Sequence, residues 1–425
     1  MPIRRTEFGT GLRVVTERMP GVRSVALGFW VLAGSRDEPP RISGSSHFLE
    51  HLLFKGTRSR TARDIAEAFD AVGGDVNAFT AKEYTCFYAR VQDRDLPMAV
   101  EHLCDMLQHS VIRSQDLDAE RQVILEEINM HEDTPDDLVH DVLNETLWPD
   151  HPLGRPILGT VESITSATRE QIRRYYRRHY VPGSFVVSAA GDLQHEVLLD
   201  LISEHMDTGP VRRDGPNDGS SLGGWNMRRA GHAPTPSGQV SVRRRKTEQA
   251  HICLGTNGLS RTDPDRFAFG VVNNAIGGGM SSRLFQEVRE RRGLAYSVYS
   301  YHTMYVEAGL FAAYAGTTPA RAHQVLDILR DQLAEVAEGG LTQTEFDRAK
   351  GHLKGSLVLS LDDPSGRMSR LGKSELSHGE ILTVNQTLAR IRAVTLEDTQ
   401  RVARRVLSQP FSLSVLGPFG RKAFA

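Results

Sequence analysis

Apolar and polar positions along the chain follow two different periods, and the change between them marks the predicted elements. Residues 22–35, VRSVALGFWVLAGS, and residues 79–91, FTAKEYTCFYARV, are rich in β-branched and aromatic side chains, which is typical of strands. Residues 61–73, TARDIAEAFDAVG, and residues 96–111, LPMAVEHLCDMLQHSV, place apolar side chains at helical spacing. Strands and helices mixed in this way predict an α+β fold, a mostly antiparallel sheet with helices packed on one face.

The order of elements repeats in the second half of the chain. Residues 118–154 carry the same apolar pattern as residues 343–379 when Glu120 is aligned with Asp347. Each half then closes with a helix that begins at a Thr cap, a turn containing Pro, and a short apolar strand ending in Gly. Each half therefore predicts the order strand, strand, helix, strand, strand, helices, strand.

Low-complexity sequence separates the two halves. Residues 208–238 are dominated by Gly, Pro, Ser and Asp, and apolar periodicity stops there. The sequence predicts a first domain at residues 1–207, a linker at 208–238 and a homologous second domain at 239–425.

Length and composition agree with a globular protein of more than one domain. The chain has 425 residues, 39% of them hydrophobic and 24% charged. A net charge of −2 gives no reason to expect nucleic acid or an anionic membrane as partner. Cys86, Cys104 and Cys253 form no paired spacing, and we find no secretory signal and no apolar window long enough for a membrane span. We therefore expect a protein of a reducing compartment, which in a bacterial cell is the cytoplasm.

One apolar helical run contains three ionisable side chains. In residues 43–57, SGSSHFLEHLLFKGT, His47 and His51 are four residues apart and share a helix face. Two imidazoles on one face suit zinc, and Glu50 is better placed to take a proton from a metal-bound water than to bind the metal. The order His-Xaa-Xaa-Glu-His occurs among zinc proteases. Two hydrogen-bonded core histidines beside a solvated Glu would give the same pattern, so a third ligand decides between the interpretations.

A predicted helix at residues 119–133, AERQVILEEINMHED, offers carboxylates for that third position. The candidates are Glu120, Glu126, Glu127, Glu132 and Asp133. Glu120 and Glu127 are seven residues apart and share a face, whereas Glu126 falls off that face and is interpreted as solvated. An ordinary charged surface helix is the alternative.

Four segments together carry a resemblance to a known family. HFLEHLLFKGT, GGDVNAFTAKEYT, ERQVILEEI and GGGMSSRLFQEVRERRGLAYSV occur in family order, and the likeness extends from about residue 6 to about residue 416. The sequence resembles the pitrilysin/insulinase family of zinc metallopeptidases, most closely the short bacterial relatives of the mitochondrial processing peptidase. Long members of that family enclose substrate in a clamshell of four related domains, and this chain has two, half of a clamshell.

The resemblance implies a zinc endopeptidase that hydrolyses peptides or unfolded segments inside a closed chamber. His47, His51 and Glu127 would bind one Zn2+ per chain. Glu50 would be the general base for attack of zinc-bound water on the scissile carbonyl, and Glu120 an acidic residue of the catalytic site that orients a ligand histidine.

The second half lacks the zinc pattern but has other residues that match the family. Lys354 occupies the repeat position of Glu127, so this half cannot hold the same site. The resemblance implies that Arg289 and Tyr296 contact substrate and stabilise the tetrahedral intermediate. Without the resemblance, a solvated helix end for Arg289 and a core position for Tyr296 would be the preferred interpretation. GGGM, residues 277–280, lacks the Lys and Ser/Thr of a phosphate loop and resembles, in shorter form, the family's glycine-rich loop.

The resemblance also implies how substrate and subunits meet. Asn77, Ala78 and Phe79 match the substrate-binding strand, to whose edge an extended peptide can add. An ordinary strand with Phe79 in the core is the alternative. A chain with two of the four domains implies a homodimer in which Arg289 and Tyr296 act in trans.

Two other functions stay open. One is a catalytically silent scaffold subunit; the other is an active subunit of a heterodimer with a degenerate partner. Scaffold relatives typically lose the zinc residues, which are all present here.

Overall fold

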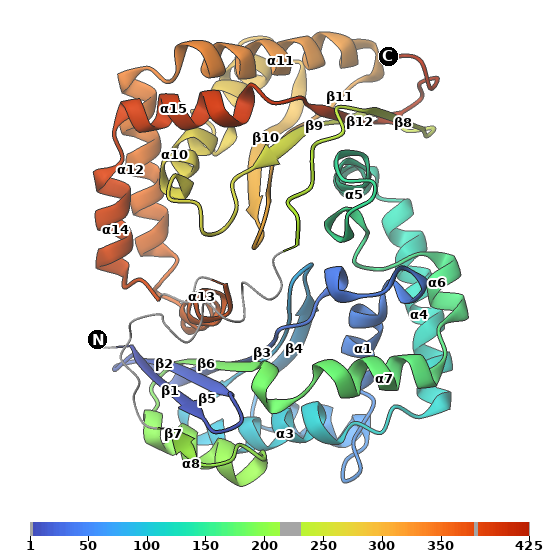
Figure 1. Ribbon diagram of the computed structural model, residues 1–425, viewed down its shortest axis with the longest axis vertical. Helices are drawn as coiled ribbons and strands as arrows, with labels where there is room; N and C mark the ends of the chain where they lie inside the picture. The colour runs from blue at the N-terminus through green and yellow to red at the C-terminus, as the bar shows by residue number, and fades with distance from the viewer. Residues whose placement is uncertain (1–2, 213–230, 378–380, 425) are drawn as a thin grey trace. The chain divides into compact units, whose positions relative to one another are not determined.

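The structure is a computed structural model that describes residues 3–212, 231–377 and 381–424 (Figure 1). The described residues divide into two compact units, each assembled from three stretches of the chain. Unit 1 comprises Met1–Asn129, Pro156–Gly224 and Ser360–Ile381, and unit 2 comprises Met130–Arg155, Trp225–Leu359 and Leu382–Ala425.

Unit 1 is built on a mostly antiparallel sheet. Among the described residues its seven strands run in the order β4-β5-β3-β6-β2-β1-β7, and β2 pairs with β6 in parallel. The strands are β1 (Arg4–Phe8), β2 (Arg13–Arg18), β3 (Ser24–Val31), β4 (Asp75–Thr80), β5 (Thr85–Gln92), β6 (Phe185–Gly191) and β7 (Val211–Arg212). Side chains alternate between the two faces of each strand, so β3 buries Leu27 and Phe29 on one face and Ala26 and Trp30 on the other.

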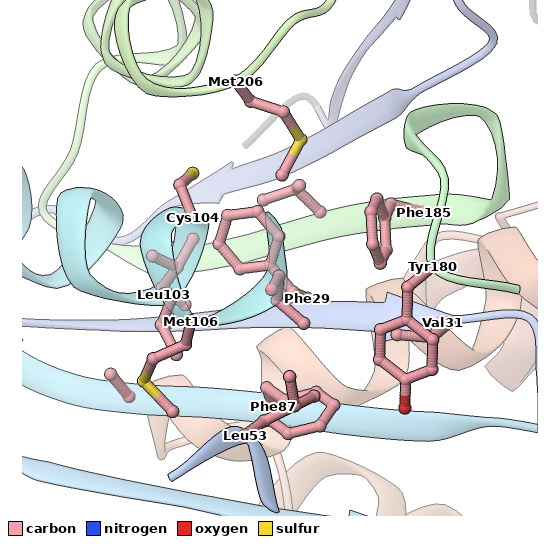
Figure 2. Close-up of a cluster of buried hydrophobic side chains, with 14 of the residues drawn as sticks. Phe29, Val31, Leu53, Phe87, Leu103, Cys104, Met106, Tyr180, Phe185 and Met206 are labelled. Atoms are coloured by element: carbon pink, nitrogen blue, oxygen red, sulfur yellow. The ribbon is translucent and has the colours of Figure 1, made fainter. Parts of the chain in front are cut away.

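One face of this sheet carries helices from the first half of the sequence. Figure 2 shows Phe29 and Phe87 of the sheet beside Leu103 and Met106 of α3 in the buried core. The helices of this half within unit 1 are α1 (Ser45–Leu53), α2 (Ala62–Ala71), α3 (Leu96–His109), α4 (Ser114–Glu132), α6 (Val161–Ser166), α7 (Arg169–His179) and α8 (His195–His205). The last three residues of α4 belong to unit 2.

The opposite face is covered by α13 (Pro364–Ser377), which comes from the second half of the sequence and is drawn in the orange-red of that half in Figure 1. Met368 and Leu376 of α13 pack with Ala26 and Trp30. The approach is close, because a Cβ added at Gly372 would lie 2.1 Å from Nε1 of Trp30. A glycine at this position is therefore a requirement of helix docking.

Unit 2 repeats the strand order on a smaller scale. Among the described residues five strands run in the order β10-β11-β9-β12-β8, and β8 pairs in parallel with β12 as β2 does with β6. The strands are β8 (Val240–Arg244), β9 (Ala250–Gly258), β10 (Ala295–Met304), β11 (Gly309–Thr317) and β12 (Ser412–Gly417). Equivalent strands in equivalent order confirm the internal repeat seen in the sequence.

The helices of unit 2 follow the same plan. Those from the second half are α10 (Arg266–Gly277), α11 (Ala322–Gly339), α12 (Gln343–Leu359), α14 (Val384–Ala393) and α15 (Leu396–Leu407). The other sheet face packs against α5 (Pro135–Leu147), which comes from the first half. Leu138, Val142 and Leu143 of α5 are buried there with Leu310 and Ala312. The halves of the sequence thus exchange one helix each.

The predicted fold class is confirmed, with one local correction. The predicted helix at residues 61–73 is α2, whose N-cap Thr61 accepts a hydrogen bond from the Asp64 amide. The strand predicted at residues 79–91 is wrong in its extent, because residues 79–80 end β4 and a turn closed by the Ala81 amide and the Tyr84 carbonyl (2.8 Å) precedes β5. The four residues of this turn, AKEY at 81–84, include no Gly, Pro, Asn, Asp or Ser to mark it, so the pattern does not reveal it.

The predicted domain boundaries stay a prediction. Residues 213–230 of the predicted linker lie outside the described residues. The compact units differ from a division at 208–238 in that α5 belongs to unit 2 and α13 to unit 1. In the part of the chain that is described, no helix is long and apolar enough to cross a membrane.

Candidate metal centre

Helix α1 holds its ionisable side chains on the face that is turned away from the core. Phe48, Leu49, Leu52 and Leu53 are fully buried, whereas His47, Glu50 and His51 are half-buried. The helix start is fixed by Glu38, whose carboxylate accepts hydrogen bonds from the amides of Gly44 and Ser46, each 2.6 Å long. The three polar side chains therefore project from a firmly anchored helix.

Helix α4 adds a carboxylate to the two histidines. An oxygen of Glu127 lies 3.6 Å from Nε2 of His47, and its other oxygen lies 3.6 Å from Nε2 of His51. These separations are too long for good hydrogen bonds. They approach the distance of about 3.3 Å that separates two ligands of a tetrahedral zinc with bonds of about 2.0–2.1 Å.

Two imidazoles and one carboxylate form a donor set that zinc accepts. The ligand atoms of His47, His51 and Glu127 all lie within 4.8 Å of one another. In the part of the chain that the structure describes, this is the one group of three His, Cys, Asp or Glu side chains so arranged. Burial lowers the pKa of His47 to about 4, and repulsion from the neighbouring His51 is the smaller cause. The His47 ring is therefore neutral at neutral pH, and a neutral imidazole is the form that binds metal.

Glu120 lies behind the histidines and is bonded on both of its oxygens. Its Oε2 lies 3.0 Å from Nδ1 of His51, and its Oε1 lies 2.7 Å from Nζ of Lys55. The residue is only 6% exposed. This burial does not fit the alternative of an ordinary charged surface helix, while Glu126 is exposed as predicted.

The remaining carboxylates of α4 lie elsewhere. Glu132 forms ion pairs with Arg243 and Arg245 within unit 2. Asp133 follows the end of α4. Neither residue is part of the group formed by the two histidines and Glu127.

Glu50 is held beside this group by a strand. Its Oε2 accepts a 2.5 Å hydrogen bond from Oγ1 of Thr80, the last residue of β4. Burial raises the pKa of Glu50, while the bond from Thr80 acts in the opposite direction. The side chain is not one of the three whose ligand atoms converge, which leaves it available for proton transfer.

The predicted substrate strand is the outer strand of its sheet. Within the described part of the chain, β4 pairs on one side with β5, and its other edge has no strand beside it. Asn77 is exposed, whereas Ala78 and Phe79 are half-buried. Phe79 packs edge-on against Trp30, with ring centroids 5.9 Å apart, so it also belongs to the packing of the sheet.

Arg289 and Tyr296 are brought together in unit 2. The guanidinium carbon of Arg289 lies 4.7 Å from the ring centroid of Tyr296 and 4.8 Å from that of Phe285. Tyr296 is 78% exposed, so the alternative of a core tyrosine is wrong. An exposed aromatic hydroxyl beside a guanidinium is a pair of donors available to a ligand.

The structure also places Lys354 and the glycine-rich stretch of unit 2. Lys354 lies half-buried on α12 at the repeat position of Glu127. In the glycine-rich stretch at residues 277–280, Gly277 is packed so closely that an added Cβ would lie 2.1 Å from the amide nitrogen of Ser300. Met280 beside it is 75% exposed.

Sequence reasoning missed three residues that support the centre. Glu38 anchors α1, Thr80 binds Glu50, and Lys55 binds Glu120. Spacing contained a signal for Lys55, because a residue four positions after His51 lies on the same side of the chain where the helical turn continues. Glu38 and Thr80 come from other elements, and no spacing rule connects them to α1.

Helix-borne imidazoles, a carboxylate from a second helix and an adjacent carboxylate outside the ligand group are the side chains typical of mononuclear catalytic zinc sites. Comparisons with known proteins agree with that interpretation. Residues 13–161 match the family model described as Insulinase (Peptidase family M16), and residues 166–353 match the model described as Peptidase M16 inactive domain. The pattern of His47, Glu50 and His51 falls in the first match.

Relatives of similar length extend the match over the whole chain. A Streptomyces coelicolor protein named an uncharacterized zinc protease is 52% identical, over 99% of this chain and 90% of its own length. A Bacillus subtilis protein of the same description is 41% identical, over 98% of this chain and 99% of its own length. The chain therefore belongs to the insulinase family, peptidase family M16, which confirms the resemblance seen in the sequence.

Solved structures share the fold at low sequence identity. A crystal structure described as a peptidase M16 inactive domain from Pseudomonas fluorescens superposes with a TM-score of 0.88 at 21% identity, covering 99% of this chain and 98% of that one. A protease from Helicobacter pylori gives a TM-score of 0.87 at 20% identity, covering 98% and 99%.

Proposed function

We propose that this protein is a zinc-dependent endopeptidase that hydrolyses peptides or unfolded segments inside a closed chamber. The observation that carries the proposal is the convergence of His47, His51 and Glu127, with Glu50 held beside them by Thr80. Membership in a family whose relatives are named zinc proteases supports the same activity.

His47, His51 and Glu127 would hold one zinc ion per chain. When bound, zinc supplies a Lewis acid that polarises a carbonyl and makes water more acidic. Glu50 takes a proton from the attacking water while the oxygen of that water forms a bond to the scissile carbon. The carbon–nitrogen bond then breaks, and Glu50 passes that proton to the leaving amine. A pKa raised by burial suits a carboxylate that must hold a proton between these two transfers.

Substrate would bind as an extended strand on the outer edge of β4. Peptide backbone groups then pair with the edge of the sheet at Asn77, Ala78 and Phe79, and alternate side chains point to opposite faces. Thr80 ends this strand at Glu50, so an added peptide would pass beside the proposed base. This mode of binding selects extended, unfolded segments over folded proteins.

Hydrogen-bond donors to the reacting carbonyl oxygen would come from a second copy of the chain. We propose a homodimer in which Arg289 and Tyr296 hold the reacting carbonyl oxygen at the zinc centre of the other subunit. Their mutual packing and the exposure of Tyr296 support a role in ligand binding. Glu50→Gln and Arg289→Ala proteins, each inactive alone, should regain activity when their subunits are exchanged. No recovery after exchange, verified by mixed-tag pull-down, would exclude action in trans.

The decisive experiment combines peptide cleavage with metal analysis. Wild type should cleave a quenched fluorescent peptide library and hold about one zinc per chain, the number of sites that the donor set forms. Glu50→Gln should keep the zinc and lose cleavage by a factor of about 10² or more. Glu127→Gln should lose the zinc, and Glu126→Gln on the exposed neighbouring position should lose neither.

Other outcomes discriminate between the functions. Zinc binding without cleavage in wild type would favour a scaffold or a heterodimer, and a degenerate partner would then be sought. Absence of zinc from wild type would overturn the proposal.

A further inference from the structure

We propose that Lys55 is a positioning residue of the metal centre, acting through Glu120 on the ligand histidine His51. The inference rests on the proposed function, since it concerns how this chain presents a nitrogen to zinc. Lys55 lies beyond the end of α1 and is not one of the residues that would touch metal or substrate.

The contacts form a chain of three side chains. Nζ of Lys55 lies 2.7 Å from Oε1 of Glu120, and Oε2 of Glu120 lies 3.0 Å from Nδ1 of His51. An ionised carboxylate only accepts hydrogen bonds, so Nδ1 of His51 donates and its proton is placed there. Nε2 then carries the lone pair, and this is the nitrogen that faces Glu127 at 3.6 Å.

Lys55 is itself held by a defined turn. The amide of Lys55 donates to the Leu52 carbonyl at 3.1 Å, which continues the last turn of α1. Gly56 follows at φ +117, where an added Cβ would lie 2.7 Å from the Arg60 carbonyl oxygen. Thr57 is then tied to Asp105 by a 2.6 Å hydrogen bond. The ammonium group therefore reaches Glu120 from a fixed backbone.

The two ligand histidines differ in their support. In the described part of the structure, Nδ1 of His47 is buried and has no hydrogen-bond partner, whereas Nδ1 of His51 has Glu120. Of the two rings, only that of His51 is oriented by a carboxylate on its Nδ1 in the described structure, and that carboxylate is Glu120. Apart from His51, the cation that forms an ion pair with Glu120 in the described structure is Lys55.

A purely structural ion pair would behave differently. The side chain of Lys55 is 37% exposed and that of Glu120 is 8% exposed, so removing Lys55 takes one partner from a largely buried carboxylate and lowers the free energy of unfolding as well. Loss of an outer partner of a metal ligand, in addition, weakens metal binding by about 10- to 100-fold. Zinc affinity measured beside the unfolding midpoint of the metal-free protein separates the two roles.

The test is a chelator competition that yields zinc dissociation constants for the full chain. We expect Lys55→Met and Lys55→Gln to weaken zinc binding about tenfold at a temperature well below the unfolding midpoint of each metal-free variant, and Lys55→Arg to restore most of the affinity. Lys350→Met is the control, because Lys350 binds the carbonyls of Arg392 and Val394 at 2.9 and 2.7 Å in unit 2. It should leave zinc affinity unchanged.

A double variant shows whether Lys55 acts through Glu120. Lys55→Met combined with Glu120→Gln should bind zinc no more weakly than Glu120→Gln alone, because the path is already broken. Wild-type zinc affinity in both neutral Lys55 variants, or a full additional loss in the double variant, would overturn the inference and leave the proposed function standing. Wild type without zinc would overturn both.

Discussion

Three side chains on one turn of α1 differ in chemistry because each meets a different neighbour. His47 faces Glu127 and is kept neutral by burial, His51 lies between Glu127 and Glu120, and Glu50 is bonded to Thr80. The pattern of the sequence is local, but this division of roles is produced by contacts with α4 and β4. A hydrogen bond across elements therefore holds Glu50 beside the group of converging ligand atoms and not within it.

Thr80→Val tests that division. The substitution keeps the shape of the side chain and removes the 2.5 Å bond to Glu50. Loss of a hydrogen bond to a charged group costs about 1.5–3 kcal/mol, so we expect kcat/KM to fall by about 10- to 100-fold, with zinc content unchanged. Peptide cleavage kinetics and metal analysis on the same samples measure both quantities.

The matched control is Thr85→Val at the position that pairs with Thr80 in β5. Thr85 donates to the Ala33 carbonyl at 2.9 Å, so its loss should change stability more than kcat/KM. Equal losses of kcat/KM in both variants would show that Thr80 acts only through the fold.

At the residue scale, spacing predicts what one helix can place. The intervals between His47, Glu50 and His51, and between Glu120 and Glu127, fix faces because a helix repeats every 3.6 residues. Thr80 and Glu38 could not be found this way, since their contacts with α1 depend on how a strand and a loop pack against it. The convergence of His47, His51 and Glu127 is a property of the fold, whereas the roles of these residues are implied by the family.

At the scale of elements, the helix that carries Glu120 and Glu127 continues almost directly into α5. Asp133 and Thr134 are the only residues between α4 and α5. Nε2 of His131 lies 3.1 Å from Oδ2 of Asp141 and ties the end of α4 to the middle of α5. This hydrogen bond raises the pKa of His131.

The raised pKa gives the His131–Asp141 contact a defined pH dependence. The folded-state pKa lies above the unfolded value of about 6.5, so its stabilisation is complete below that pH and is lost as pH rises through the folded-state pKa. The unfolding free energy of wild type should exceed that of His131→Gln, and the excess should be larger at pH 5.5 than at pH 9. Because the pair is partly exposed, we expect the two excesses to differ by less than about 1 kcal/mol.

Urea unfolding at the two pH values measures this difference. Asp141→Asn should also lower the unfolding free energy relative to wild type by more at pH 5.5 than at pH 9, because it removes the carboxylate that favours protonated His131. The same stability difference at both pH values would contradict a charged contact.

At the scale of the whole molecule, two helices are exchanged between the halves of the sequence. Amphipathic patterns in residues 118–154 and 343–379 predict helices and reveal that they are repeats. These patterns do not show which sheet a helix packs against, because an apolar helix face can be buried against the apolar face of either sheet. The assignment of α13 to unit 1 depends on particular contacts, such as Glu375 with Arg5 and Arg13 at 3.1 and 3.2 Å.

This exchange predicts that the first half of the chain is incomplete alone. Residues 1–207 without α13 would expose Trp30 and leave Arg13, which is 5% exposed, without the buried carboxylate of Glu375. Breaking a buried pair by removing one partner costs about 3–5 kcal/mol, a large part of the stability of a domain. We therefore expect the isolated fragment to aggregate or to bind a hydrophobic dye.

Supplying α13 on a second fragment should reverse that loss. Residues 1–207 co-expressed with residues 208–425 should form a soluble complex that binds zinc. Gly372→Leu in the second fragment should prevent the rescue, because a Cβ there would lie 2.1 Å from Nε1 of Trp30. Gly351→Leu on α12 is the matched control, since an added Cβ there meets nothing within 4 Å. A first fragment that is soluble alone, with the unfolding transition of the complex, would show that unit 1 is stable without α13 and that the exchanged helix serves another purpose.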